Sequence, residues 1–229
     1  MRNHHALAGI YLIGVLWTST AHAQTADPAF YDNRYAIFTA NNYGLRKGEA
    51  YYQNSMLLFN QAYFGFSDAF SCGFGIVPSF LFGGGTTPAW LNPRFHQSIA
   101  PGRFAIGGGA FIGGFWGENL SGLNFIYVSA TAGSPGSNVS LHTGRGVFGR
   151  RFAGKTALGI SGMHHFKSHL SLIAENYFAD DIGIASMGLR LKRKKITIDG
   201  VVILPVIEGE VFELLPWFSL IVPFRINMP

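Results

Sequence analysis

The chain alternates apolar and polar side chains over short segments, which is the pattern of β-strands with two different faces. In residues 184–192, IASMGLRLK, one face carries Ala, Met and two Leu side chains, and the other carries Ser, Gly, Arg190 and Lys192. Residues 196–202, ITIDGVV, alternate in the same way, with Thr197 and Asp199 on the polar face. A two-residue turn at 193–194 would place Arg190 opposite Thr197 and diagonal to Asp199, within side-chain reach. The two segments predict a hairpin with one apolar face and one face that carries an ion pair.

Turn-forming residues separate such segments along the chain. Clusters of Gly, Pro, Asn, Asp and Ser recur, for example at 41–48, 83–90 and 133–138, and tight turns select these residues. The runs between them have the length of strands that cross a membrane in a barrel. We expect an all-β protein of about twelve strands, within a range of roughly 10 to 12. The expected strands are 34–40, 49–65, 70–82, 92–100, 104–116, 122–132, 139–148, 155–163, 169–178, 184–191, 196–203 and 212–224.

Composition changes this picture from a soluble β-protein to a membrane barrel. Apolar residues make up 48% of the chain, and charged residues 13%, against about 25% in a typical soluble domain. Residues 104–116, FAIGGGAFIGGFW, hold no charge and many glycines, whereas a membrane helix needs about 20 mostly apolar residues and few glycines. A closed barrel also pairs every backbone polar group in lipid. We therefore expect one antiparallel up-and-down transmembrane β-barrel over residues 34–229.

The first residues follow the order of a secretory signal peptide. Arg2 precedes an apolar run over 6–17, and the small residues Ala21 and Ala23 follow it. This order predicts cleavage between Ala23 and Gln24, and the run is too short to cross a bilayer as a helix. We expect a signal peptide over 1–23 and a short periplasmic segment over 24–33, with a buried N-terminal helix as the alternative. Cys72 is the one cysteine of the chain and is expected to be a small apolar filler.

Charges and aromatic residues favour an outer-membrane location over a soluble exported barrel. Most charges fall in turns, such as KRKK at 192–195, whereas the outer faces of a soluble sandwich would need them. The expected connections after odd-numbered strands are on the whole the longer ones, as extracellular loops are. Aromatic residues near the expected strand ends are typical of girdles at the two bilayer interfaces. They are Tyr51, Tyr52, Phe64, Phe66, Phe115, Trp116, Tyr177, Phe178, Trp217 and Phe218.

The chain resembles the small outer-membrane β-barrel proteins of bacteria, particularly those of Bacteroidetes-type genomes. The stretches that carry the resemblance are GLRKGEAYYQN (44–54), NQAYFGFSDAFSCGFG (60–75), LIAENYF (172–178) and SMGLRL (186–191). Many members of this class end in a Phe that the assembly machinery reads. Here RINMP follows Phe224, which departs from that pattern. The resemblance implies a location and an architecture, and no particular substrate.

Four charged residues within or near the expected strands form a candidate site: Glu175, Arg190, Asp199 and Arg145. We expect the cluster inside the barrel. Isolated charges there would be costly, so we expect them to pair. The cluster is either a structural device that fills a narrow lumen, or a selectivity feature or ligand site.

Histidines and serines do not form a recognisable catalytic or metal site. His164 and His165 are adjacent, so in a strand they point to opposite faces. Ser140, Ser171, Asp180 and His142 stand at no spacing that singles out a triad, and the G-x-S-x-G, H-E-x-x-H and P-loop motifs do not occur. We predict no catalytic residue, no bound metal and no cofactor.

The main functional hypothesis is a non-enzymatic outer-membrane barrel with a structural, adhesive or narrow-pore role. A lipid-modifying barrel enzyme and a soluble exported binding barrel are the alternatives. The expected partners are membrane lipids and the outer-membrane assembly machinery, and the oligomeric state is left open. The formal net charge is +5, but no extended basic face accompanies it, so nucleic acid is not an expected partner.

Overall fold

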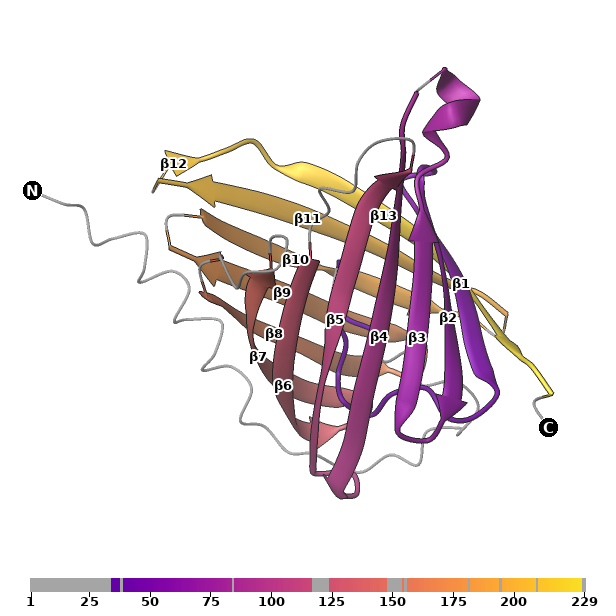
Figure 1. Ribbon diagram of the computed structural model, residues 1–229. Coiled ribbons are helices and arrows are strands. Elements are labelled where there is room, and N and C mark those ends of the chain that lie inside the picture. Colours follow the sequence, from indigo (N-terminus) through magenta and orange to yellow (C-terminus); the bar gives the residue numbers. More distant parts are fainter. Residues whose placement is uncertain are drawn as a thin grey trace, which may run out of the picture.

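Twelve antiparallel strands close into one barrel in the computed structural model (Figure 1). It describes residues 34–37, 39–83, 85–116, 124–147, 154, 156–180, 182–193, 195–208 and 210–227. The strands are β1 (Glu49–Ser55), β2 (Phe59–Ser67), β3 (Phe70–Ile76), β4 (Thr87–Ala100), β5 (Phe104–Trp116), β6 (Asn124–Ser134), β7 (Ser137–Val147), β8 (Thr156–Lys167), β9 (Leu170–Ala179), β10 (Ile182–Lys192), β11 (Thr197–Ile207) and β13 (Leu215–Arg225). The short β12 (Glu210–Val211) pairs antiparallel with the end of β11, and a 3₁₀ turn, η1 (Ser79–Phe82), follows β3. The prediction of an all-β antiparallel barrel of about twelve strands is confirmed. The predicted signal peptide and the segment 24–33 lie outside the described residues.

Each strand pairs with its neighbours in the chain, and the last strand closes the ring. β13 pairs with β1, where Glu49 lies opposite Arg225, and on its other side with β11, where Thr197 lies opposite Ile221. All the pairings are antiparallel. Closure removes the open edges that an isolated sheet would present.

The two ends of the barrel differ in the length of their connections. At one end, here called the turn end, the connections are 68–69, 101–103, 135–136, 168–169 and 193–196. At the other, the loop end, they are 56–58, 77–86, 117–123, 148–155, 180–181 and 208–214. β1 begins and β13 finishes at the turn end. Bacterial membrane barrels show this asymmetry, with short periplasmic turns and longer extracellular loops. Residues 41–48, predicted as one of the longer loops, instead precede β1.

Side chains alternate between the outer wall and the lumen along the strands. On β10, Met187 and Leu189 are 50% and 51% exposed, whereas Ser186 and Arg190 are buried. The charged residues of the described strands obey the same rule. Four are buried in the lumen, namely Arg94, Glu175, Arg190 and Asp199. The others lie within two residues of a strand end, namely Glu49, Arg145, Lys167, Lys192, Glu210 and Arg225. The described part of the outer wall therefore carries no charge at mid-height.

Two of the predicted strands are wrong, and the errors cancel in the strand count. Residues 34–40 were predicted as the first strand, but the described part of this range, 34–37 and 39–40, lies inside the barrel and makes an isolated bridge between Arg34 and Ala40. Residues 49–65, predicted as one strand, form β1 and β2 with a tight turn between them. In that turn Leu58 N donates to Ser55 O at 3.1 Å, and Met56 and Leu57 have φ of 52° and 63°. In a sequence, a turn with two residues at positive φ is usually indicated by Asn and Gly at these positions, and the chain has Met and Leu there.

The predicted register of the β10–β11 hairpin is wrong by two residues. The connection spans 193–196 and is closed by a hydrogen bond from Arg193 N to Ile196 O at 2.8 Å. Arg190 therefore lies directly opposite Asp199, not diagonal to it. Because a shift of two residues keeps each side chain on its face, the predicted apolar and polar faces are retained.

The aromatic residues predicted to form girdles divide between the two faces of the wall. Tyr52, Phe66 and Phe218 are exposed on the outer face. Tyr51 is instead only 4% exposed, Tyr177 hydrogen-bonds inside the lumen, and Trp217 packs against a buried cluster there. The girdle prediction is wrong for these three, because closeness to a strand end does not determine which face a side chain takes.

Candidate functional site

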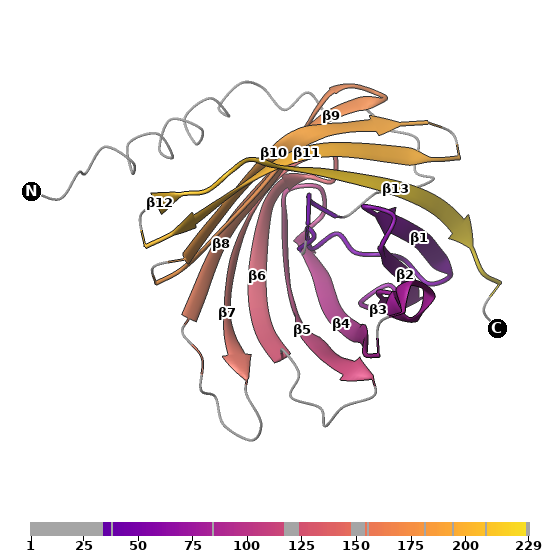
Figure 2. The same ribbon diagram turned by 90° about the horizontal axis from the view of Figure 1, so that it is seen from above.

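Residues before β1 enter the barrel from the turn end and occupy part of its lumen (Figure 2). We call residues 34–37 and 39–43 the lumen segment. Tyr35 N donates to Thr39 O at 3.0 Å, so the segment folds back on itself as a narrow loop. Tyr35 and Ala36 are 0% exposed, and Asn41 and Asn42 are 1% exposed. The segment is therefore closely packed against the inner wall of the barrel.

Glu175 on β9 holds the tip of the lumen segment. Its carboxylate accepts hydrogen bonds from Thr39 N at 2.6 Å and Thr39 Oγ1 at 2.8 Å. Ile37 N and the Tyr177 hydroxyl also donate to it. Glu175 is 0% exposed, and a buried carboxylate is stable when several donors satisfy it. One wall residue thus fixes two backbone N–H groups of the segment.

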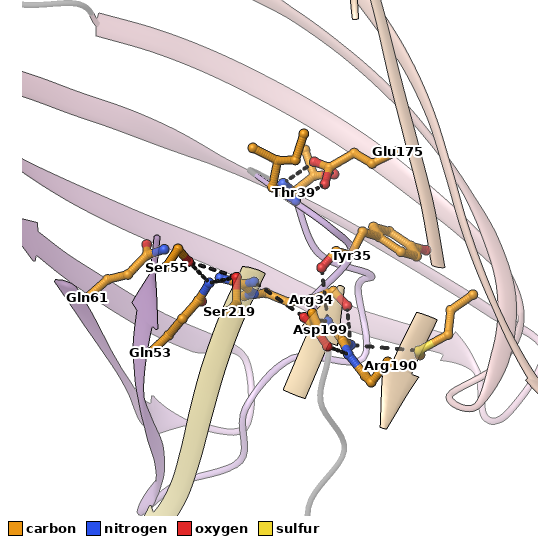
Figure 3. A network of polar contacts seen from close by, with 12 residues as sticks. Arg34, Tyr35, Thr39, Gln53, Ser55, Gln61, Glu175, Arg190, Asp199 and Ser219 are labelled. Carbon is orange, nitrogen blue, oxygen red and sulfur yellow. Dashed lines mark hydrogen bonds and ion pairs between the residues drawn. The ribbon is translucent and has the colours of Figure 1, made fainter. Parts of the chain in front are cut away.

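Arg190 and Asp199 form the second attachment, nearer the turn end (Figure 3). Arg190 Nε and Nη2 donate to the two Asp199 carboxylate oxygens, each at 2.7 Å. The same guanidinium donates from Nη1 to Arg34 O at 2.7 Å and from Nη2 to Tyr35 O at 3.0 Å. Arg34 Nη2 lies 4.0 Å from Asp199 Oδ2. Arg190 therefore binds both its partner on the wall, Asp199, and the backbone of the lumen segment.

The opposite wall holds the returning half of the segment. Arg94 Nη2 on β4 donates to Ala40 O and Asn41 O, both at 3.3 Å. On β6, Thr131 Oγ1 accepts from Asn42 N at 3.0 Å. A Cβ added at Gly107 would lie 2.3 Å from Asn42 Oδ1. The glycine-rich run 104–116, which forms β5, is thus needed here for the close approach of the segment.

Tyr35 anchors the segment to β7 through its hydroxyl. That oxygen donates to Asn138 Oδ1 at 2.6 Å and lies 2.5 Å from Ser140 Oγ. The ring packs with Ala36 on an apolar part of the wall that includes Met163 and Ile173. Polar and apolar contacts thus hold the same residue.

Three of the four predicted site residues contribute to holding the lumen segment in place. Glu175, Arg190 and Asp199 all face the lumen and hold the lumen segment. Arg145 does not join them, because it is exposed near the loop end of β7, where its Nε donates to Gly154 O at 2.8 Å. Arg94 is a fourth lumen charge, and it was not among the predicted site residues. The alternation of Asn92, Arg94 and His96 on one face of the predicted strand 92–100 could have revealed it.

The serines and histidines considered for catalysis lie apart or serve other contacts. Ser140 Oγ is engaged by Tyr35 and by Thr131 Oγ1 at 2.6 Å. His164 Nδ1 lies 3.2 Å from the hydroxyl of Ser137, a serine not considered before, at the turn end. Within the described residues, no three His, Cys, Asp or Glu side chains gather where they could hold a metal ion. None of the helices in that part of the chain is long and apolar enough to span a membrane.

The fold is similar to that of the KdgM porin. One KdgM porin structure superposes with a TM-score of 0.56 at 11% sequence identity, covering 78% of this chain and 99% of that chain. A second, of the KdgM porin in complex with disordered oligogalacturonate, gives a TM-score of 0.55 at 11% identity, with the same coverage of 78% and 99%. No protein-family model matches the chain, and a search of curated proteins found no match.

Proposed function

We propose that the protein is an outer-membrane barrel of the porin type, which passes small polar solutes through a lumen narrowed by the lumen segment. The observation that carries the proposal is the division of the wall. The outer face of the described strands is uncharged at mid-height, while the lumen side carries charges, amides and hydroxyls. The short turns at one end and the likeness to the KdgM porin support the same reading.

The two alternative functions agree less well with the side chains. A soluble exported barrel would place residues such as Phe95 and Leu141, which are 65% and 61% exposed, in water. A lipid-modifying enzyme needs a nucleophile with a base and an orienting group. Ser140 already serves to hold the lumen segment. The proposed function is therefore non-enzymatic.

The lumen segment sets the width of the path in this proposal. Its backbone is bound by groups from β4, β6, β9 and β10, so it spans the lumen between opposite walls. We expect a small conductance in the wild-type protein and a larger one when the tip of the segment is released. Glu175→Gln releases it, since an amide has one acceptor oxygen where the carboxylate has two.

The experiment compares single-channel currents of the wild type, Glu175→Gln and Glu213→Gln in planar bilayers. Glu213 is an exposed carboxylate of the loop-end connection 208–214, so Glu213→Gln is the control for loss of one charge. Unboiled electrophoresis in SDS shows that each variant is folded. We expect Glu175→Gln to raise the conductance and Glu213→Gln to leave it near the wild-type value. Folded protein that gives no current in either the wild type or Glu175→Gln would overturn the proposed function.

A further inference from the structure

Four inward-facing aromatic residues line the loop-end half of the lumen. We call Phe59, Trp90, Phe111 and Trp217 the aromatic arc. Ring centroids are 5.3 Å apart for Phe59 and Trp217, 6.5 Å for Phe59 and Trp90, and 6.0 Å for Trp90 and Phe111. Each ring contacts the next, so the arc runs from β13 through β2 and β4 to β5. All four residues are half-buried, so part of each side chain stays accessible.

Register shows that the arc faces inward. Phe59 lies opposite the buried Ser55, and Trp217 lies opposite the buried Val201. Trp90 covers Gly75 of β3, where an added Cβ would lie 2.1 Å from the indole. The outward neighbours are different, since Phe218, next to Trp217, is 60% exposed on the outer wall.

A layer of uncharged polar side chains lies directly below the arc. On three strands the arc residue is followed two positions later by a polar residue on the same face: Gln61 after Phe59, Asn92 after Trp90, and Ser219 after Trp217. All three strands run from the loop end towards the turn end, so this layer lies about 7 Å deeper. Gln53 and Ser55 complete it, with Gln53 Nε2 donating to Ser55 Oγ at 2.7 Å (Figure 3).

Two buried oxygens of this layer have no hydrogen-bond partner. Gln53 Oε1 and Asn92 Oδ1 are unpartnered, and their residues are 1% and 4% exposed. Buried polar groups usually find partners, and an exception calls for a ligand or a water. Asn92 Nδ2 meanwhile donates to Tyr63 OH at 3.2 Å, which fixes the direction of the amide.

We propose that the aromatic arc and the polar layer below it form a binding site for neutral hydroxylated rings, such as the pyranose units of an uncharged oligosaccharide. The C–H face of such a ring packs on an aromatic face, while its hydroxyls donate to amide oxygens. The chemistry favours a neutral ring, because the residues of the arc and of the polar layer named here carry no charge. The site rests on the proposed function, since the solute must enter the lumen from the loop end.

The test measures binding of maltohexaose, a neutral probe, and trigalacturonate, an acidic probe, to folded protein in detergent. Tryptophan fluorescence gives Kd, and interruption of single-channel current gives an independent readout. We expect saturable binding of maltohexaose that is tighter than that of trigalacturonate. Phe59→Leu and Trp217→Leu keep an apolar side chain and remove the flat face, and each should raise Kd about tenfold. Phe218→Leu, next to Trp217 on the outer wall, should leave Kd unchanged.

The outcomes separate this inference from the proposed function. Currents that maltohexaose does not interrupt, together with no fluorescence change, would overturn the binding site and leave the porin intact. Equal Kd values in Trp217→Leu, Phe59→Leu and the wild type, or tighter binding of trigalacturonate, would also overturn it. Saturable maltohexaose binding in protein that passes no current would support the site and count against the proposed function.

Discussion

Arg190 shows how a single side chain joins the barrel wall to the lumen segment. Its guanidinium reaches both oxygens of Asp199 and the carbonyl oxygens of Arg34 and Tyr35. Arginine suits this position, since its rigid fork binds a carboxylate through two hydrogen bonds and still has donors for other acceptors. The sequence predicted that Arg190 and Asp199 pair. The carbonyl acceptors could not be predicted, because no sequence pattern indicates that the lumen segment lies inside the barrel.

Arg190→Ala should lower the free energy of unfolding by about 3–5 kcal/mol, because it leaves the Asp199 carboxylate buried without its main partner. Arg34 lies 4.0 Å from that carboxylate, so the loss is expected at the lower end of the range. Urea titration in lipid vesicles, followed by tryptophan fluorescence, measures the change.

The double variant Arg190→Met with Asp199→Leu is the matched control. It removes both charges and fills the space with apolar side chains, so it should unfold closer to the wild type than Arg190→Ala does. An unfolding midpoint of Arg190→Ala equal to that of the wild type would show that the pair is not structural.

At the scale of the element, the β1–β2 turn explains why one predicted strand proved to be two. Residues 49–65 read as one apolar and aromatic run, and the turn is made by Met56 and Leu57 at positive φ. Side chains with a Cβ are disfavoured in that region by roughly 1–2 kcal/mol per residue. The closed ring imposes this turn, since β1 must pair with both β2 and β13. No local pattern could have revealed a constraint that comes from closure.

Leu57→Gly should stabilise the protein by about 1 kcal/mol, because glycine adopts positive φ without strain. The Leu57 side chain is 87% exposed, so little burial is lost. Leu57→Ala is the control, as it removes the same bulk and keeps a Cβ. A shift of the urea midpoint in Leu57→Gly no larger than that in Leu57→Ala would mean that the backbone conformation is not the cause.

The lumen segment is the element that sequence reasoning placed wrongly. Residues 34–40 have the length and composition of a short strand, and the alternation test has little power over so few residues. The lumen segment cannot join the wall, because β1 and β13 already pair with each other and complete the ring. Backbone N–H and C=O groups of the segment form hydrogen bonds with side chains of the wall instead of with a neighbouring strand.

For the whole molecule, alternation and low charge content were sufficient to predict the architecture. They hold because the barrel divides its residues between two environments, and the division repeats along twelve strands. An error at the boundary of one predicted strand therefore leaves the predicted barrel architecture unchanged. The aromatic arc could not be predicted in this way, since its members come from four strands and meet only through the register of the closed ring.

The proposed membrane location makes the cost of a charge depend on its height on the outer wall. Met187 lies at the middle of β10 and Leu158 near the loop-end start of β8, and both side chains face outward, 50% and 58% exposed. Met187→Arg should lower the free energy of unfolding in lipid vesicles by about 2–4 kcal/mol, and Leu158→Arg by about 0–1 kcal/mol. Urea titration of vesicle-inserted protein measures both.

The same pair of variants distinguishes lipid from water around the wall. In a soluble barrel, both positions would face solvent, and arginine at either would change stability by no more than about 0.5 kcal/mol. Equal and small effects at residues 158 and 187 would therefore contradict a membrane location. A cost at Met187 that is larger than the cost at Leu158 reports hydrocarbon around the middle of the barrel, because only there is the guanidinium far from water.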